Sequence, residues 1–352
     1  MRGVDFEQRS FTRRIVFRPG ACDEVPVEIE ALGARRPLVL ASGSQRERGA
    51  ALTAALGPEA SLLDEVREHV PLELAERARE LARQRDAGVL VSIGGGSATG
   101  LAKAIAVTLD VPIVAVPTTY AGSELTPMYG ITAGGEKRTV RDPRVVPRVV
   151  VYDPLLTLSM PPRTTGASGL NALAHAVGAL YTPGASPVDR PLAREAIATL
   201  WSAIPAAHDH PGDLEARSTA LLGALLAGLS VAAAGGSYHH TVCHVLGGAY
   251  DLPHALTHAL VLPWSIALAA RLEPAAHAEL GRLLGTSSPQ RAVHRLATAV
   301  TAPSRLADAG LPVERIDEAA ARVLAAFPPR YAVEAGDVRA LVAGAVTGAE
   351  PA

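Results

Sequence analysis

The chain has 352 residues, of which 48% are hydrophobic and 19% charged, and its formal net charge is −2. This composition excludes a mainly disordered chain, and the length favours two domains around one cleft. The near-neutral charge favours neither a nucleic-acid nor an anionic-membrane partner, so we expect a small-molecule ligand. Only two cysteines, a charged N-terminus and a glycine-interrupted apolar run at 219–238 predict a cytoplasmic protein without a membrane span.

Short apolar runs alternate with helical stretches through the first half of the chain. The runs are typical of strands buried on both faces, and the second and third are rich in β-branched residues: Leu38–Ala41, Gly88–Ile93 and Val111–Val116. The helical stretches are Arg46–Leu56, Leu72–Arg85 and Ser97–Leu109. Strand, helix and strand in succession form a βαβ unit, so we predict a Rossmann-like α/β domain with a parallel sheet over residues 1–158.

A glycine run follows the second of these strands. Gly94, Gly95 and Gly96 precede Ser97, which opens a predicted helix. A helix N-terminus presents unpaired N–H groups and a positive dipole end, and glycine lets a phosphate approach closely. Ser97 is expected to cap the helix or to donate its hydroxyl. The loop matches neither GxGxxG nor a Walker A loop. We predict a pyrophosphate site, and the alternative is an ordinary tight turn.

Hydroxyl side chains follow the next predicted strand, within the segment Pro117–Glu124 (PTTYAGSE). Because the carboxyl ends of neighbouring parallel strands share one crevice, we expect this segment to lie beside the glycine run. Thr118, Thr119 and Ser123 are predicted to hold the adenosine side of a dinucleotide. Lys137 would reach a phosphate or ribose, or would be a solvated surface lysine.

Alanine and leucine dominate from about residue 159, where prolines and glycines separate segments of helical length. We expect an all-helical catalytic domain over residues 159–352, entered through a proline cluster at 154–162. Its predicted helices are Asn171–Tyr181, Pro191–Ile204, Leu214–Ala234, His240–Leu246, Ala255–Arg271 and Ile316–Phe327.

Five of the eleven histidines lie in this second half within twenty residues: His239, His240, His244, His254 and His258. His240 and His244 are four residues apart and share a helix face, as do Asn171 and His175. Imidazoles that converge from separate helices bind a divalent metal, or act as acids and hydrogen-bond donors to a developing alkoxide. The alternative is a set of buried histidines without a catalytic role.

The motifs together resemble the iron-containing alcohol dehydrogenase family. The stretches that carry the resemblance are Gly94–Ser97, Pro117–Glu124, Gly169–Val177 and His240–Pro263. It implies the dehydroquinate synthase-like architecture, in which a dinucleotide-binding domain and a helical domain enclose a cleft that binds NADH or NADPH. It also implies a homodimer.

The resemblance further implies a metal site made by one aspartate and three histidines. These positions hold Asn171, His175, His240 and His254 in this chain, and His244 would lie near them without being a ligand. An amide oxygen is a weaker, uncharged ligand compared with a carboxylate. We therefore expect no bound metal, and Asn171, His175, His240 and His254 as its ligands if one is present.

The stretches 171–177, 118–124 and 243–248, together with Gly100, resemble the maleylacetate reductases. The resemblance implies a branch of the family that reduces maleylacetate to 3-oxoadipate in aromatic-ring degradation and is regarded as metal-independent. Two positions depart from that branch. Gly178 replaces its usual glutamate, and Pro328-Pro329-Arg330 matches its Asn-Pro-Arg-Pro only loosely. A shifted substrate, as in a biosynthetic pathway, remains an alternative.

The resemblance suggests a mechanism in which histidines stabilise negative charge on the substrate oxygen. His240, His244 and His254 are the candidates, followed by His175, and Tyr120 would donate a hydrogen bond to a substrate carboxylate. Protonated histidines would attract a dicarboxylate, so activity would fall as the pH rises. The alternatives are a metal-dependent alcohol or polyol dehydrogenase, a dinucleotide-binding sensor, and a lyase or synthase that retains its NAD.

Overall fold

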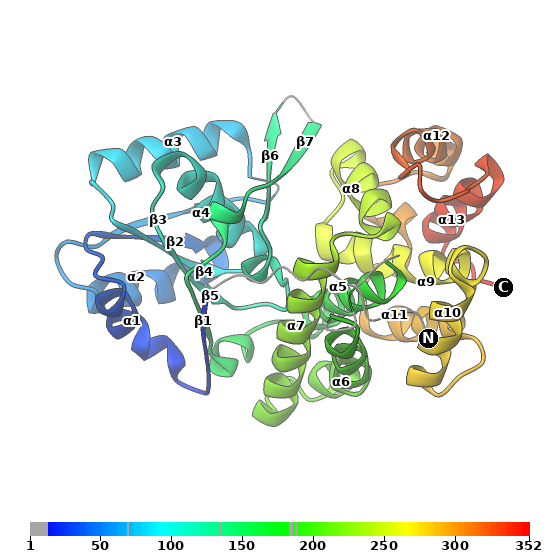
Figure 1. Ribbon diagram of the computed structural model, residues 1–352, viewed down its shortest axis with the longest axis horizontal. Helices are drawn as coiled ribbons and strands as arrows, with labels where there is room; N and C mark the ends of the chain where they lie inside the picture. Colours follow the sequence, from blue (N-terminus) through cyan, green and yellow to red (C-terminus); the bar gives the residue numbers. More distant parts are fainter. Residues whose placement is uncertain (1–12, 69, 134–135, 183–185, 187–188) are drawn as a thin grey trace, which may run out of the picture. The chain divides into compact units, whose positions relative to one another are not determined.

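The computed structural model describes the chain outside residues 1–12, 69, 134–135, 183–185 and 187–188 (Figure 1). It divides into two compact units, one formed by Ser10–Met160 and the other containing Pro161–Ala352. This division falls two residues beyond the expected boundary at 158. Each unit has its own hydrophobic core and is described by itself.

The first unit contains a six-stranded parallel sheet with the strand order β1-β8-β5-β4-β2-β3. The strands are β1 (Arg14–Phe17), β2 (Pro37–Ser42), β3 (Ser61–Val66), β4 (Val89–Gly94), β5 (Ile113–Pro117) and β8 (Val149–Tyr152). Its helices are α1 (Val25–Ala31), α2 (Arg46–Ala55), α3 (Leu72–Gln84) and α4 (Gly96–Leu109). The central strands β4 and β5 are buried along their whole length, as the apolar runs predicted. The Rossmann-like fold is confirmed.

In the sequence, a two-stranded antiparallel hairpin separates β5 from β8. It consists of β6 (Met128–Ala133) and β7 (Glu136–Arg141), preceded by the short 3-10 helix η3 (Ser123–Leu125). Lys137 is on β7 and pairs in register with Thr132, but its side chain lies outside the described residues. Its predicted contact with a dinucleotide therefore stays a prediction.

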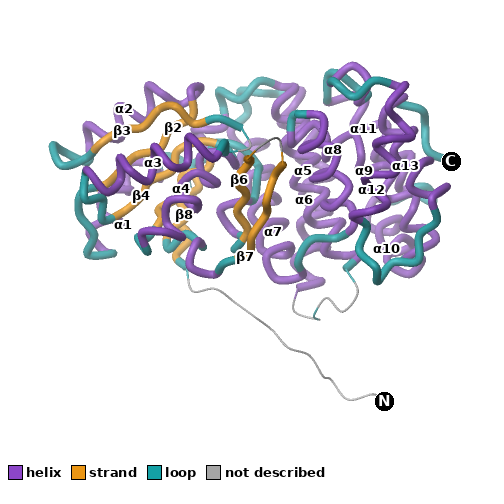
Figure 2. Tube along the Cα trace, turned by 90° about the horizontal axis from the view of Figure 1, so that it is seen from above, coloured by secondary structure: helices purple, strands orange, loops and turns teal. Residues whose placement is uncertain are grey.

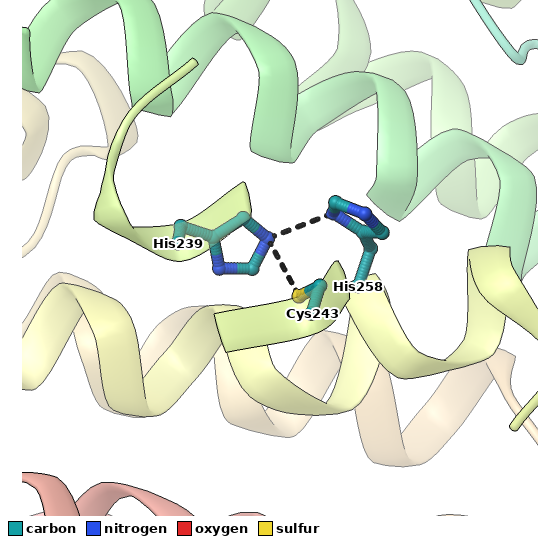
Figure 3. A group of neighbouring side chains, drawn as sticks. All are labelled: His239, Cys243 and His258. Atoms are coloured by element: carbon teal, nitrogen blue, oxygen red, sulfur yellow. Dashed lines mark hydrogen bonds between the residues drawn. The ribbon is translucent and has the colours of Figure 1, made fainter. Parts of the chain in front are cut away.

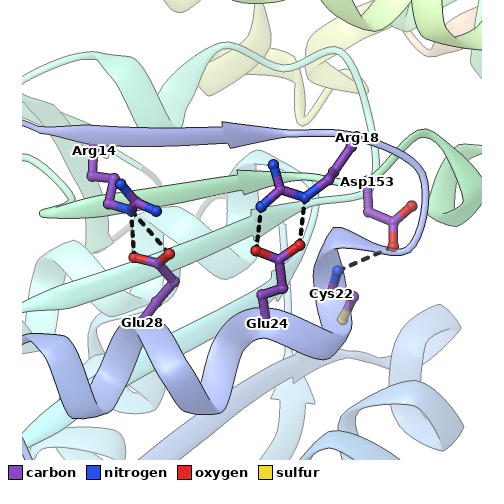
Figure 4. Close-up of polar contacts among 6 residues, drawn as sticks. All are labelled: Arg14, Arg18, Cys22, Glu24, Glu28 and Asp153. Carbon is purple, nitrogen blue, oxygen red and sulfur yellow. Dashed lines mark hydrogen bonds and ion pairs between the residues drawn. The ribbon is translucent and has the colours of Figure 1, made fainter.

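Charged side chains fasten the edge strand β1 to the helix that follows it (Figure 4). The Nε of Arg14 donates to both carboxylate oxygens of the buried Glu28 on α1, at 2.9 and 2.8 Å. Asp153, directly after β8, accepts hydrogen bonds from the backbone N–H groups of Gly20 and Cys22, at 3.0 and 3.2 Å. The carboxylate thus ties the β1–α1 turn to the end of the neighbouring strand.

The second unit is helical, which confirms the expected fold class (Figures 1 and 2). Its helices are α5 (Pro162–Tyr181), α6 (Asp189–Asp209), α7 (Leu214–Ala234), α8 (Tyr238–Tyr250), α9 (His254–Leu272), α10 (Pro274–Leu284), α11 (Pro289–Val300), α12 (Ile316–Ala326) and α13 (Ala335–Thr347). The helix α5 packs against α6, α7 and α9, and every residue from Thr165 to Tyr181 is buried. It is the central helix of this unit.

Two helices, α7 and α9, are long and apolar enough to cross a membrane by composition alone. In the structure, 67% and 61% of their most apolar stretches are buried by the rest of the protein. Both therefore have the environment of core helices in a globular protein.

Candidate active site

The glycine run forms the predicted turn from strand to helix in the first unit. Gly94 ends β4 with a φ of 150°, and Gly95 is the N-cap of α4, without a side-chain cap. Ser97 lies in the first helical turn, so the prediction that it caps the helix was wrong. Gly95, Gly96 and Ser97 remain partly exposed, and the first N–H groups of a helix have no intrahelical partner. This arrangement suits a pyrophosphate.

The hydroxyl segment lies beside the glycine run, as expected from the parallel sheet. The backbone N–H of Thr118 donates to the carbonyl of Gly94 at 2.9 Å. A Cβ added to Gly95 would lie 3.2 Å from the Thr119 hydroxyl, and one added to Gly96 would lie 3.8 Å from the Ser123 Cβ. Glycine at 95 thus allows this hydroxyl to approach the backbone of the helix N-terminus.

Two predicted side chains of this segment are buried. Tyr120 is only 1% exposed and Thr118 only 4% exposed. A contact of Tyr120 with a substrate carboxylate stays a prediction, as does a contact of Thr118 with the adenosine.

A fully buried lysine holds this segment in place, and sequence reasoning missed it. The ammonium group of Lys103, on α4, donates to the carbonyl oxygens of Ser123, Thr126 and Met128, at 2.5, 2.7 and 2.8 Å. Burial lowers the pKa of Lys103 to about 7, and the nearby Glu124 opposes that shift. The signal in the sequence was a single charged residue in the otherwise apolar helix stretch at 101–107.

Six histidines from three helices of the second unit meet in one group, which we call the histidine cluster. His175 comes from α5, three from α8 and two from α9: His239, His240, His244, His254 and His258. The rings of His175 and His240 stack with centroids 5.1 Å apart, and those of His244 and His254 lie 6.0 Å apart. The predicted histidines thus converge within one unit, and two further histidines join them.

His258 is the centre of the histidine cluster, although sequence reasoning gave it no role. Its ring lies 4.5 Å from that of His254, 5.2 Å from that of His240 and 6.2 Å from those of His175 and His244, between centroids. His258 follows His254 by four residues on α9. The same i, i+4 spacing that identified His240 and His244 was therefore a usable signal.

Hydrogen bonds through His239 hold the ring of His258 at its Nδ1 atom (Figure 3). The Oγ of Ser265 lies 2.9 Å from Nδ1 of His239, whose Nε2 lies 3.0 Å from Nδ1 of His258. The Sγ of Cys243 is 3.5 Å from the same Nε2. Nδ1 of His258 is thus bonded to His239, whereas its Nε2 has no hydrogen-bond partner among the described residues. Whether that atom carries a proton follows from the tautomer of His239.

Burial keeps four of the six clustered histidines uncharged near neutral pH: His175, His239, His240 and His258. It lowers the pKa of His240 to about 4 and that of His175 and His258 well below the usual 6.5, and neighbouring histidines lower the latter two further. The expectation that protonated histidines attract a dicarboxylate was therefore wrong for His175 and His240, and it stays a prediction for His244 and His254. Both ring nitrogens of His240 are buried without a hydrogen-bond partner in the described part of the chain. This ring is free to bond a ligand.

The comparisons with known proteins agree with this geometry. The family described as iron-containing alcohol dehydrogenase matches residues 12–154, and its C-terminal counterpart matches residues 165–341. The chain belongs to the iron-containing alcohol dehydrogenase family. It is accordingly an NAD(P)-dependent oxidoreductase.

Relatives in this family cover almost the whole chain. It is 42% identical over 342 residues to maleylacetate reductase 1 of Cupriavidus pinatubonensis, with 96% of each chain covered. It is 43% identical over 340 residues to maleylacetate reductase of Burkholderia cepacia, covering 96% of this chain and 97% of that one. The solved structure of maleylacetate reductase from Agrobacterium tumefaciens has a TM-score of 0.92 and 40% identity, with 99% of each chain covered.

The positions that the resemblance assigned to a metal hold three imidazoles and one amide, without an anionic ligand. Three imidazoles, from His175, His240 and His254, are a donor set found in catalytic zinc sites. Asn171 adds an uncharged amide oxygen where the resemblance places an aspartate. A second group, formed by His239, Cys243 and His258, has its ligand atoms within 4.8 Å of one another. Burial raises the pKa of the Cys243 thiol well above its usual value, which opposes a thiolate there.

The low histidine pKa values predict a pH profile that does not fall through neutrality. A lowered pKa means that the neutral imidazole is complete above that pKa, so His240 is already neutral at pH 6. We expect the kcat of this family member at saturating substrate to change by less than about threefold between pH 6 and 8.5. A stopped-flow or steady-state profile tests this. A decline with a midpoint between pH 6 and 7.5 that disappears in His240→Ala would contradict it.

Proposed function

We propose that the chain reduces maleylacetate to 3-oxoadipate with NADH or NADPH. The observation that carries the proposal is His240, whose two ring nitrogens are buried and unpartnered in the described structure within a group of six histidines. The near-full-length similarity to proteins named maleylacetate reductase supports this substrate. We further propose a cytoplasmic homodimer that acts in aromatic-compound catabolism, without a nucleic-acid or membrane partner.

The reaction adds a hydride and a proton across a carbon–carbon double bond that is conjugated to a ketone. NADH or NADPH, when bound, would supply a hydride to the alkene carbon remote from the ketone, and the alkene electron pair would then form an enolate. Negative charge therefore builds on the ketone oxygen. Protonation of the enolate at carbon gives the saturated ketone, so each turnover consumes one NAD(P)H and one proton.

In this proposal, the histidine cluster stabilises the enolate oxygen. A neutral imidazole carries one N–H donor, and such a donor can serve as the electrophile of an enolisation site. His240 donates directly to the oxygen. His258 lies 5.2 Å from it between ring centroids and is held through His239, so it limits where the His240 ring can turn. His244, His254 and His175 are the other histidines packed around this donor in the proposal.

The cofactor is proposed to bind to the first unit through its pyrophosphate. Gly96 and Ser97 are partly exposed at the start of α4, and their N–H groups donate to the phosphate oxygens in this proposal. Thr119 and Ser123 lie next to these glycines and bind the adenosine side. Lys103, on α4, donates to the carbonyl oxygens of Ser123 and Thr126 and so holds that segment against the helix.

A divalent metal is not required in this proposal. If one binds, Asn171, His175, His240 and His254 would hold it, and it would supply Lewis-acid polarisation of the substrate oxygen. The neutral amide at 171 argues for weak binding, because no carboxylate offsets the charge of the cation.

The test is an assay of NADH and NADPH oxidation at 340 nm with maleylacetate, other 4-oxo acids and simple aldehydes, with and without a chelator. We expect maleylacetate to be reduced with one NAD(P)H consumed per 3-oxoadipate formed. Absence of turnover with maleylacetate at any pH from 6 to 8.5 would overturn the proposal.

A second candidate is a metal-dependent alcohol or polyol dehydrogenase of the same family. The buried group of His239, Cys243 and His258, whose ligand atoms lie within 4.8 Å of one another, favours it. The same assay separates the two, because this candidate predicts activity on simple aldehydes that is lost with chelator and restored by Fe²⁺ or Zn²⁺.

A further inference from the structure

A buried serine hydroxyl stands without a partner at the start of α8, the helix that carries three of the clustered histidines. Ser237 is the N-cap of α8 and only 2% exposed, and its side chain makes no cap hydrogen bond. Its Oγ has no hydrogen-bond partner among the described residues. An N-cap serine ordinarily accepts from the N–H of the second or third helical residue. At this helix end, the hydroxyl is therefore left for a ligand, whereas the N–H of His240 bonds to the Ser237 carbonyl at 3.1 Å.

A glycine on the facing helix packs closely against this hydroxyl. A Cβ added to Gly178, on α5, would lie 2.8 Å from the Ser237 Oγ and 3.5 Å from Cε1 of His240. Any other side chain at 178 would enter the space that the hydroxyl and the His240 ring share. Ser237 and the proposed enolate donor thus both lie next to this one small residue.

A guanidinium group borders the same helix end. Arg330 donates to the carbonyl of Gly236 at 3.4 Å, directly before Ser237 in the chain. It lies over the ring of Tyr331, 5.1 Å from the centroid, and that ring packs edge-on against Tyr238 at 5.0 Å. Since Tyr238 is the first residue of α8, these aromatic contacts fix the arginine at the positive end of the helix dipole.

We propose that the start of α8 binds a carboxylate group of the substrate, through the Ser237 hydroxyl, the first N–H groups of the helix and the Arg330 guanidinium. This inference rests on the proposed function, in which the substrate is a dicarboxylate. A helix N-terminus and an arginine are both suited to a carboxylate. The adjacent His240 then meets the ketone oxygen of the same molecule, so the subsite determines specificity for acids over simple aldehydes.

Three variants test the subsite: Ser237→Ala, Arg330→Met and Gly178→Ala. Each is expected to raise the KM for maleylacetate by about tenfold or more while kcat at saturation changes by less than about threefold, because binding and not chemistry is affected. Gly178→Ala is the most informative. Its Cβ would lie 2.8 Å from the Ser237 Oγ, so thermal melting of each variant is measured to show that it is folded. Ser202→Ala and Arg322→Met, at exposed positions, are the matched controls.

Two truncated substrates identify the carboxylate that binds. One lacks the carboxylate beside the double bond, and the other lacks the carboxylate beside the ketone. For the substrate that lacks the carboxylate bound at this subsite, the variants and the parent protein should have equal KM values. Equal increases for maleylacetate and both monoacids, or no increase at all, would overturn the subsite. If the parent protein does not turn over maleylacetate, the proposed function fails instead. Calorimetric titration of 3-oxoadipate into parent and Ser237→Ala then decides the subsite, because equal affinities would contradict it.

Discussion

The His240→Ala variant is expected to lose a factor of about one hundred to one thousand in kcat with maleylacetate. The proposed role of this ring is to donate a hydrogen bond to the enolate oxygen, and removal of one such donor typically costs on the order of 3–4 kcal/mol of transition-state stabilisation. Its two ring nitrogens have no partner among the described residues, so alanine breaks no hydrogen bond that the structure records. The loss should therefore appear in turnover and not in folding.

Two further variants make this result specific. His240→Asn retains an N–H donor, so it should keep more activity than alanine does. His210→Ala changes an exposed histidine and should leave kcat unchanged. Thermal melting of all three variants shows whether each is folded. A His240→Ala protein with kcat within about threefold of the parent would remove His240 from the mechanism.

The Gly95→Val variant is expected to weaken NADH or NADPH binding by more than about tenfold. The added Cβ would lie 3.2 Å from the Thr119 hydroxyl, and the remaining methyl groups would cover N–H groups at the start of α4. A phosphate that loses such contacts loses charge-assisted hydrogen bonds of about 1.5–3 kcal/mol each. The dissociation constant can be measured by the change in NADH fluorescence on binding.

The matched control for this variant is Gly336→Val. Gly336 is exposed and has no neighbour within 4 Å of an added Cβ, so cofactor binding should not change. Unchanged cofactor affinity in a folded Gly95→Val protein would show that the pyrophosphate does not bind at this helix end.

Much of the first unit was predictable because parallel strands buried on both faces form continuous apolar runs, as in β4 and β5. The edge strand β3 was missed, since it includes Asp64 and Glu65 and no residue of it is fully buried. β8 has an apolar run as strong as that of β4, but the β6–β7 hairpin precedes it instead of the crossover helix that marks a βαβ unit.

The helical unit was predicted less completely, and the reason lies in close packing. The helix α5 begins at Pro162, nine residues before the expected start at Asn171. Its first half is rich in small and hydroxyl residues and has no apolar periodicity. A Cβ at Gly166 would lie 2.1 Å from the carbonyl oxygen of Val300, and one at Gly169 would lie 2.7 Å from Ile204. The start of this helix therefore depends on the residues that pack against it. A local sequence pattern does not contain those contacts.

In the candidate site, too, the local features were predictable and the features that depend on packing were not. The i, i+4 pairs located His175, His240 and His244 on their helices, because that spacing is a local property. The central position of His258 depends on how α5, α8 and α9 pack, and the place of Arg330 beside Ser237 joins segments almost a hundred residues apart. The histidine pKa values also required the fold, since they follow from burial.

The central claim is that neutral imidazoles do in this chain what a cation would do at a site with a carboxylate at position 171. Asn171 is the residue on which the claim depends, because it leaves the donor set of His175, His240 and His254 without an anionic ligand. Asn171→Asp restores that charge. It should raise the affinity for Zn²⁺ or Fe²⁺ without raising turnover of maleylacetate.

The most direct measurement is kcat with maleylacetate for protein dialysed against a chelator, with the metal content of the same sample determined by mass spectrometry. The account predicts full turnover at less than about one metal ion per ten chains. Turnover that disappears with the metal and returns in proportion to added Fe²⁺ or Zn²⁺ would contradict it.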